Sequence, residues 1–300
     1  MRAACILCRS RPPIENSHVI PKFAIRRLKA GNPLGTLVFS NDLNHVAQDG
    51  WKGDFLCNDC EQGFSKLETW FCREVYDPFL KTGSVKIAYG EELGLFGASV
   101  AFRYIQLALE NNPAKQVETG LGQIFENLRT SLLCRRFADL FSHLYIQFLF
   151  PVKSLGVYPP GINIYFSEAM DGKCFDFVAP PAGKFWVIYV KLPSLFFIVS
   201  EWDLKMVLRP ADHLDAHRIR SNGMLDSTSQ AGILRHLVDD VFGTRPIEIQ
   251  NNYLKMSEKR LAQNAKKIAQ VPDKEKFRVH ESFLLDQQLL ADYLKSNAPD

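Results

Sequence analysis

The stretch CILCRSRPPIENSHVIPKF, residues 5–23, holds two cysteines separated by two residues, and a second such pair lies in FLCNDCEQGFSKLE, residues 55–68. A CxxC turn places two sulfur atoms on one side of a metal ion, and two such turns complete a structural zinc site. The predicted ligands of one structural Zn²⁺ are Cys5, Cys8, Cys57 and Cys60. Without zinc we expect residues 1–75 to lose their fold. The alternative is four unrelated buried cysteines.

The composition indicates a globular chain with an ample core. Of its 300 residues, 46% are hydrophobic, and the formal charge of +3 is too small by itself to indicate nucleic-acid binding. Residues 1–30 carry seven Lys or Arg and one acid, whereas residues 41–80 carry three basic and eight acidic side chains. We expect a cytoplasmic protein, because the start lacks a secretory signal, no apolar run can span a bilayer, and paired CxxC turns favour metal ligation in a reducing compartment.

Hydrophobic periodicity and turn residues predict an α+β fold in two parts. Within residues 1–80, the patterns indicate helix 21–31, a hairpin over 36–48, and a helix from Glu61 that ends near Asp77-Pro78. Residues 81–300 are predicted to form a larger domain of unknown role with an antiparallel sheet. Its expected helices lie over about 95–150, in the segments 95–111, which Pro113 ends, 115–135 and a continuation over 137–150, and over about 228–296, in the segments 228–242, 250–269 and 274–296. Its expected strands lie over about 157–202.

Charged residues gather on both helices of the N-terminal part. Glu61 and Glu68 fall on one stripe of the helix that follows the second cysteine pair, so their carboxylates point the same way. Carboxylate oxygens are the ligands that Mg²⁺ prefers, so Glu61 with Glu68, or with Asp59 in the turn, is a candidate ligand set for a second, divalent ion. The short helix after His18 carries Lys22, Arg26 and Arg27, which we predict to bind phosphate.

The order of these motifs resembles the HNH or His-Me finger nucleases, the ββα-metal group. A CxxC pair, a histidine in an HxxP-type strand, a hairpin and a second CxxC pair running into a helix follow one another over about residues 5–75. In zinc-bearing members, such as those like the recombination endonuclease VII family, cysteine pairs bracket the ββα unit. The resemblance implies a zinc-stabilised ββα, treble-clef-like module. It assigns His18 as the general base and Glu61 as a ligand of catalytic Mg²⁺ or Mn²⁺.

Phosphodiester hydrolysis needs a deprotonated water and a cation that stabilises negative charge on the phosphate, and a neutral imidazole can take the proton near pH 7. The chain departs from the family pattern in three places. Ser17 stands where most members carry an acidic residue, Lys52 stands near the usual asparagine, and Glu61 replaces the final His or Asn.

The sequence therefore predicts an HNH-type endonuclease that acts on nucleic acid, DNA rather than RNA. It predicts no membrane partner, and it is compatible with a homo-oligomer. Two alternatives stay open. One is a zinc-stabilised module that binds nucleic acid without hydrolysing it, and the other is a protein-interaction module in which zinc only maintains shape.

The remaining polar signals have simpler interpretations. We expect Cys72, Cys134 and Cys174 to be core residues, and Arg103, in an apolar helix, to find a carboxylate in the N-terminal helix. His45 is interpreted as an exposed turn residue. The pair His213 and His217 has a spacing that allows metal ligation but is more typical of a loop, and the basic stretch 255–278 fits a solvated helix or a phosphate-binding surface.

Overall fold

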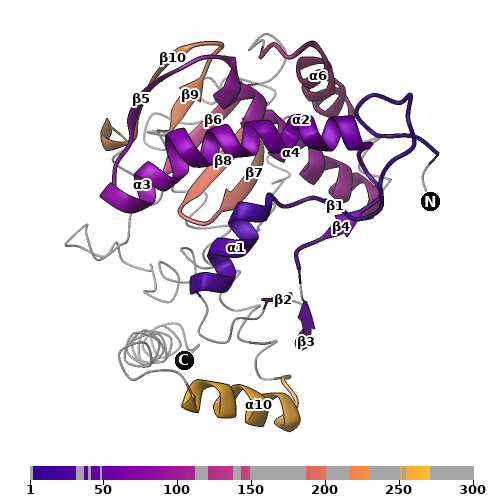
Figure 1. The fold of residues 1–300 in the computed structure, drawn as a ribbon, viewed down its shortest axis with the longest axis vertical. Helices are drawn as coiled ribbons and strands as arrows, with labels where there is room; N and C mark the ends of the chain where they lie inside the picture. Colours follow the sequence, from indigo (N-terminus) through magenta and orange to yellow (C-terminus); the bar gives the residue numbers. More distant parts are fainter. Residues whose placement is uncertain are drawn as a thin grey trace, which may run out of the picture. The chain divides into compact units, whose positions relative to one another are not determined.

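A computed structural model gives the fold of the chain in two compact units (Figure 1). The first unit comprises Met1–Ala24, Gly50–Phe148 and Phe175–Leu234, and the second comprises Ile25–Asp49, Leu149–Cys174 and Arg235–Asp300. The first unit contains residues from both sides of position 80, and the predicted domain boundary there stays a prediction. The residues that the structure describes are 3–31, 37–39, 42–47, 49–111, 121–137, 143–148, 187–200, 216–229, 251 and 255–270.

Two short strands and a helix form the N-terminal part of the first unit. Strand β1 (Ser17–His18) pairs antiparallel with β4 (Lys52–Gly53), so that His18 lies opposite Lys52. Helix α2 (Asn58–Phe71) follows β4 after a short turn and begins directly after Cys57. Phe64 and Phe71, which share its apolar face, are buried. The predicted helix in this region is thus confirmed, and it starts three residues earlier than expected.

The helical path continues past the position where we expected it to stop. A π-helical turn, η1 (Cys72–Tyr76), leads into α3 (Asp77–Thr82), so the predicted end near Asp77-Pro78 is wrong. Pro78 lies in the first turn of α3, the part of a helix that tolerates proline best. The end comes instead at Gly83, whose φ of 75° is the left-handed conformation typical of a helix C-cap.

A long central helix carries the core of the first unit. Helix α4 (Glu91–Asn111) packs beside α2 and against α6 (Leu121–Cys134). The ring centroids of Phe71 and Phe96 lie 4.0 Å apart in a stacked arrangement, and Phe96 in turn lies edge-on to Phe197 of the sheet at 5.5 Å. Helices predicted near 95–111 and 115–135 are confirmed within the described residues, with α4 starting four residues earlier than expected.

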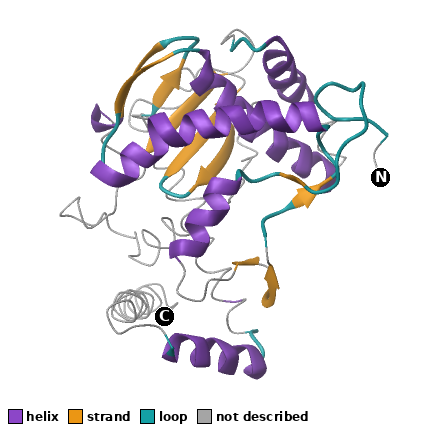
Figure 2. Ribbon diagram, in the orientation of Figure 1, coloured by secondary structure: helices purple, strands orange, loops and turns teal. Residues whose placement is uncertain are grey.

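A four-stranded antiparallel sheet covers α4 (Figure 2), and its strand order is β7-β8-β6-β9. Its strands are β6 (His143–Phe148), β7 (Val187–Leu192), β8 (Leu195–Ser200) and β9 (His217–Ile219). Strand β6 contradicts the predicted continuation of helix over 137–150, because the run LYIQF pairs on both sides, with β8 and with β9. Of the strands predicted over 157–202, β7 and β8 are confirmed, and residues 157–186 lie outside the described part.

Two further strands were not predicted. Strand β5 (Lys86–Tyr89) pairs antiparallel with β10 (Gly223–Asp226), with Tyr89 opposite Gly223. A short 3-10 turn, η4 (Ser227–Ser229), follows β10 and opens the region where a helix over 228–242 was expected, the rest of which lies outside the described residues. Among the described residues, no helix has the length and apolar character needed to cross a bilayer.

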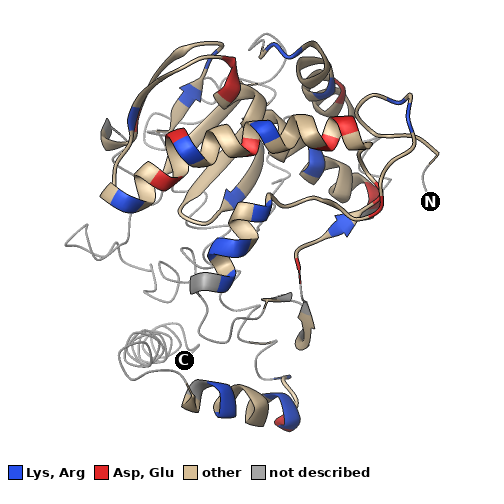
Figure 3. Ribbon diagram, in the orientation of Figure 1, with Lys and Arg blue, Asp and Glu red and all other residues tan. Residues whose placement is uncertain are grey.

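The second unit contains a hairpin and a basic helix. Strands β2 (Leu37–Phe39) and β3 (Asp42–Ala47) pair antiparallel, which confirms the predicted hairpin, and α10 (Glu258–Ala269) confirms the helix expected over 250–269. The Asn44 side chain accepts a 2.7 Å hydrogen bond from the Ser257 N–H and donates to the Lys255 carbonyl at 3.3 Å. Helix α1 (Lys22–Gly31) is also as predicted, and Figure 3 shows basic residues along α1 and α10. The helix expected over 274–296 lies outside the described residues.

Candidate functional site

The four predicted thiols form one cluster. Cys5 and Cys8 come from the N-terminal loop, Cys57 precedes α2, and Cys60 lies in its first turn. Their four sulfur atoms all lie within 4.8 Å of one another. Four thiolates at the usual Zn–S length of about 2.3 Å occupy corners of a tetrahedron with edges of about 3.8 Å, and the Sγ atoms of Cys8 and Cys57 are 3.8 Å apart. The donor set and its spacing fit one zinc ion.

Backbone hydrogen bonds hold the two cysteine pairs together. The Ile6 N–H donates to the Phe55 carbonyl and the Ile14 N–H to the Leu56 carbonyl, both at 2.8 Å. Within the first turn, the Arg9 N–H donates to the Cys5 carbonyl at 2.9 Å, and Arg9 takes a φ of 57°. The chain between the first two cysteines therefore runs beside the segment that enters the second pair.

The thiol pKa values differ within the cluster. Burial raises the pKa of Cys5 and of Cys60, and for Cys60 the hydrogen bond with Cys57 raises it further. Burial also acts to raise the pKa of Cys8, but hydrogen bonds from Ser10 and from the Arg11 backbone outweigh it and lower that pKa to about 6. A bound dication favours all four thiolates and releases the remaining protons.

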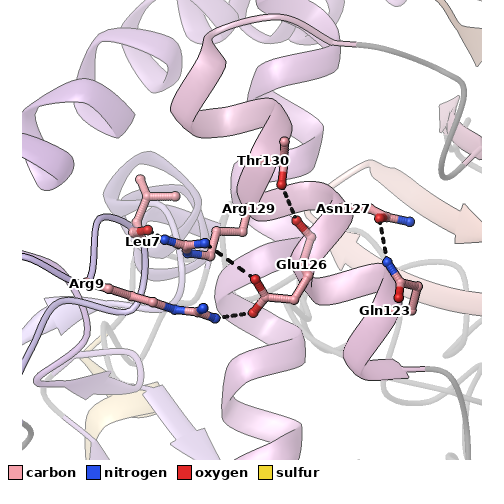
Figure 4. Close-up of polar contacts among 7 residues, drawn as sticks. All are labelled: Leu7, Arg9, Gln123, Glu126, Asn127, Arg129 and Thr130. Carbon is pink, nitrogen blue, oxygen red and sulfur yellow. Dashed lines mark hydrogen bonds and ion pairs between the residues drawn. The ribbon is translucent and has the colours of Figure 1, made fainter.

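Helix α6 contacts the first cysteine turn from far along the chain (Figure 4). Arg129 donates from Nε to the carbonyl of Leu7, which lies between Cys5 and Cys8, at 2.7 Å. Glu126 forms an ion pair with Arg9 and lies 3.4 Å from Arg129 Nη1. More than a hundred residues separate Leu7 from Arg129, so no local pattern in the sequence could have indicated this contact.

A second polar cluster lies around His18 and α2. His18 is buried on β1, with 8% of its surface exposed, and its carbonyl accepts a 3.1 Å hydrogen bond from Arg103 Nη1. The same nitrogen lies 2.9 Å from Glu68 Oε1, which confirms that Arg103 finds a carboxylate in the N-terminal helix. The guanidinium also lies over the ring of Phe64, 5.1 Å from its centroid.

Glu61 belongs to the same cluster. Burial raises the pKa of its carboxyl, the charges of Arg103, His18 and Lys22 act to lower it, and the charge of Glu68 acts to raise it. Glu61 Oε2 is buried and has no hydrogen-bond partner among the described residues. The structure thus brings His18, Glu61, Glu68 and Lys22 together. Arg26 and Arg27 are exposed on α1 in the second unit, and their role in binding phosphate stays a prediction.

Other predicted sites have separate outcomes. His45 is exposed in β3, as expected. His217 lies on β9, where its Nε2 is 2.8 Å from the Tyr89 hydroxyl, while its predicted companion His213 lies outside the described residues. Cys134 is exposed, so its assignment to the core is wrong; Cys72 is half-buried. Cys174 lies outside the described residues.

Comparisons of the chain with protein-family models, with curated proteins and with solved structures found no match. The site is therefore interpreted from its own residues and geometry.

Proposed function

We propose that the chain is a metal-dependent nuclease of the HNH type, which hydrolyses phosphodiester bonds in nucleic acid. The N-terminal strands β1 and β4 with helix α2 would form a zinc-stabilised ββα, treble-clef-like module, in which Zn²⁺ is structural. One observation carries the proposal. The residue directly after the last zinc-ligand candidate, Glu61, is half-buried beside His18, Glu68 and the guanidinium of Arg103.

In this proposal, His18 acts as the general base that takes a proton from water. Glu61 and Glu68 are the candidate ligands of Mg²⁺ or Mn²⁺, and their oxygens match the preference of these hard ions. A divalent ion bound there would stabilise the negative charge that develops on the phosphate and on the leaving oxygen. Lys22 would hold the phosphate backbone.

The proposed substrate is DNA rather than RNA, and the thiol ligands suit a reducing, cytoplasmic compartment. Residues 81–300 would position the nucleic acid or mediate self-association.

The test is cleavage of supercoiled plasmid by the zinc-loaded full chain, with Mg²⁺ or Mn²⁺, compared with a His18→Ala variant. We expect the substitution to lower the rate by a factor of about 10² to 10⁴, the usual contribution of a general base. His45→Ala is the matched control, because this histidine is exposed in the hairpin of the second unit. Equal cleavage by wild type and His18→Ala, or none by either, would contradict the proposal.

The buried state of His18 favours a second candidate function. With 8% of its surface exposed, this residue has little access to a substrate. A module that binds nucleic acid without hydrolysis needs no such access. Binding that weakens steeply with salt in the absence of cleavage would support this candidate.

A further inference from the structure

Arg103 is a buried cation with several partners in the candidate site. It is 1% exposed, the largest of the fully buried side chains among the described residues. Its Nε donates to the Ser99 carbonyl at 3.1 Å, and its Nη1 contacts both the His18 carbonyl and Glu68. Its Nη2 is buried and has no hydrogen-bond partner in the part of the chain that the structure describes. A single side chain of α4 therefore joins the histidine strand to the acidic helix.

Glu61 and Glu68 of α2 stand in different positions toward this cation. Glu68 Oε1 lies 2.9 Å from Arg103 Nη1, and the Glu68 side chain is 17% exposed. An oxygen held by a guanidinium at this distance already has a strong charge-assisted partner, which a metal ion on Oε1 would have to displace. Glu61 Oε2 has no hydrogen-bond partner among the described residues, so it can take a new ligand without breaking a bond.

The charge of Arg103 also favours Glu61 over Glu68 as the metal ligand. Glu68 and Arg103 together are neutral, and the charge of Lys22 acts on Glu61. If Glu68 left Arg103 to bind the metal, the guanidinium would be an unpaired cation in a buried position, and breaking such a pair is strongly unfavourable.

We propose that Arg103, anchored by Glu68, is the positioning residue of this site, and that Glu61 alone of the two carboxylates binds the divalent ion. The positioning role rests on the proposed nuclease function, because cleavage kinetics test it. The assignment of the metal ligand is tested by Mn²⁺ binding and needs no cleavage.

The decisive variant is the double substitution Arg103→Gln and Glu68→Gln, which keeps the pair neutral and able to share a hydrogen bond. Binding of Mn²⁺ to the zinc-loaded full chain is measured by calorimetry. We expect the double variant to bind Mn²⁺ within about threefold of wild type, and Glu61→Gln to weaken binding by at least about tenfold, the usual effect of losing a ligand or its support. A loss in the double variant as large as that of Glu61→Gln would overturn the proposal, as would the absence of Mn²⁺ binding to wild type.

Cleavage kinetics of the same variants test the positioning role. We expect the double variant to lower kcat by at least about tenfold with KM within about threefold, because a misplaced base affects the reacting geometry and not substrate binding. Unchanged kcat would refute positioning. If wild type binds Mn²⁺ as expected but cleaves nothing, the nuclease function fails while the assignment of the metal ligand holds.

A measurement on wild type covers the case in which the double variant does not fold. In crystals soaked with Mn²⁺, the anomalous signal should lie at the Glu61 carboxylate, with Glu68 still paired with Arg103. A signal shared by both carboxylates would overturn the inference.

Discussion

Gly97 of α4 lies where the central helix comes closest to the sheet. A Cβ atom added there would lie 2.7 Å from Leu144 Cδ2 on β6 and 2.9 Å from Phe197 Cδ1 on β8. Both neighbouring side chains are buried at 1% exposure or less, so neither can move aside into solvent. The substitution Gly97→Ala therefore forces the helix and the sheet apart.

Two effects of opposite sign determine the result. Alanine favours a helix interior over glycine by about 1 kcal/mol, whereas overpacking a well-packed core costs about 1–3 kcal/mol. Because two side chains on paired strands are contacted at once, we expect overpacking to dominate, with a net loss of about 1 kcal/mol. Gly63 in α2 is the matched control, because a Cβ there meets nothing within 4 Å. Gly63→Ala should stabilise by up to about 1 kcal/mol.

The assay is chemical denaturation of the zinc-loaded full chain, followed by circular dichroism. The free energies of unfolding of the two variants should differ by about 2 kcal/mol, the sum of a gain at Gly63 and a loss at Gly97. If Gly97→Ala were as stable as Gly63→Ala, α4 could not pack on the sheet as closely as described.

Two further predictions concern the metal and the pH. Removal of zinc by a chelator, or the substitution Cys57→Ser, should abolish the cooperative melt of the first unit, because structural zinc contributes on the order of 10 kcal/mol, comparable to the whole stability of a domain. Elemental analysis should find one zinc per chain in wild type and in the control Cys134→Ser, whose thiol is exposed. An unchanged melt without metal would contradict this prediction. Burial, and next the charge of Arg220, lower the pKa of His217, so below the unfolded-state pKa of about 6.5 the unfolded chain binds a proton that the folded chain does not. Stability should therefore fall as the pH drops from 7 to 5, by at most about 1.4 kcal/mol per pH unit for this one group, and His217→Gln should make the denaturation curves less dependent on pH. A variant as pH-dependent as wild type would show that this histidine does not carry the effect.

The same histidine lies beside Tyr89. The Arg220 N–H donates to the Tyr89 hydroxyl at 3.3 Å, and this hydroxyl lies 2.8 Å from His217 Nε2.

Local patterns in the sequence were sufficient for several elements. The spacing of two CxxC pairs predicted the cluster of four thiols, since each turn fixes two sulfur atoms by itself. The periodicity of Phe64 and Phe71 predicted the buried face of α2, and it also put Glu61 and Glu68 on one stripe. The polar turn between two β-prone runs predicted the hairpin of β2 and β3.

Contacts between distant residues were beyond such patterns. The run over 143–148 is apolar and short, and this fits a buried helix or a strand equally; pairing with β8 and β9 makes it a strand. The sequence indicated that Arg103 needs a carboxylate, but only the packing of α4 beside α2 selected Glu68 and brought the guanidinium to the His18 carbonyl, 85 residues away. By itself the sequence determined each pair of thiols and the acidic stripe, because both depend on neighbours within one or two turns of chain. The tertiary structure decided which acid is paired and which stays available, because that depends on where a buried cation from another helix comes to lie.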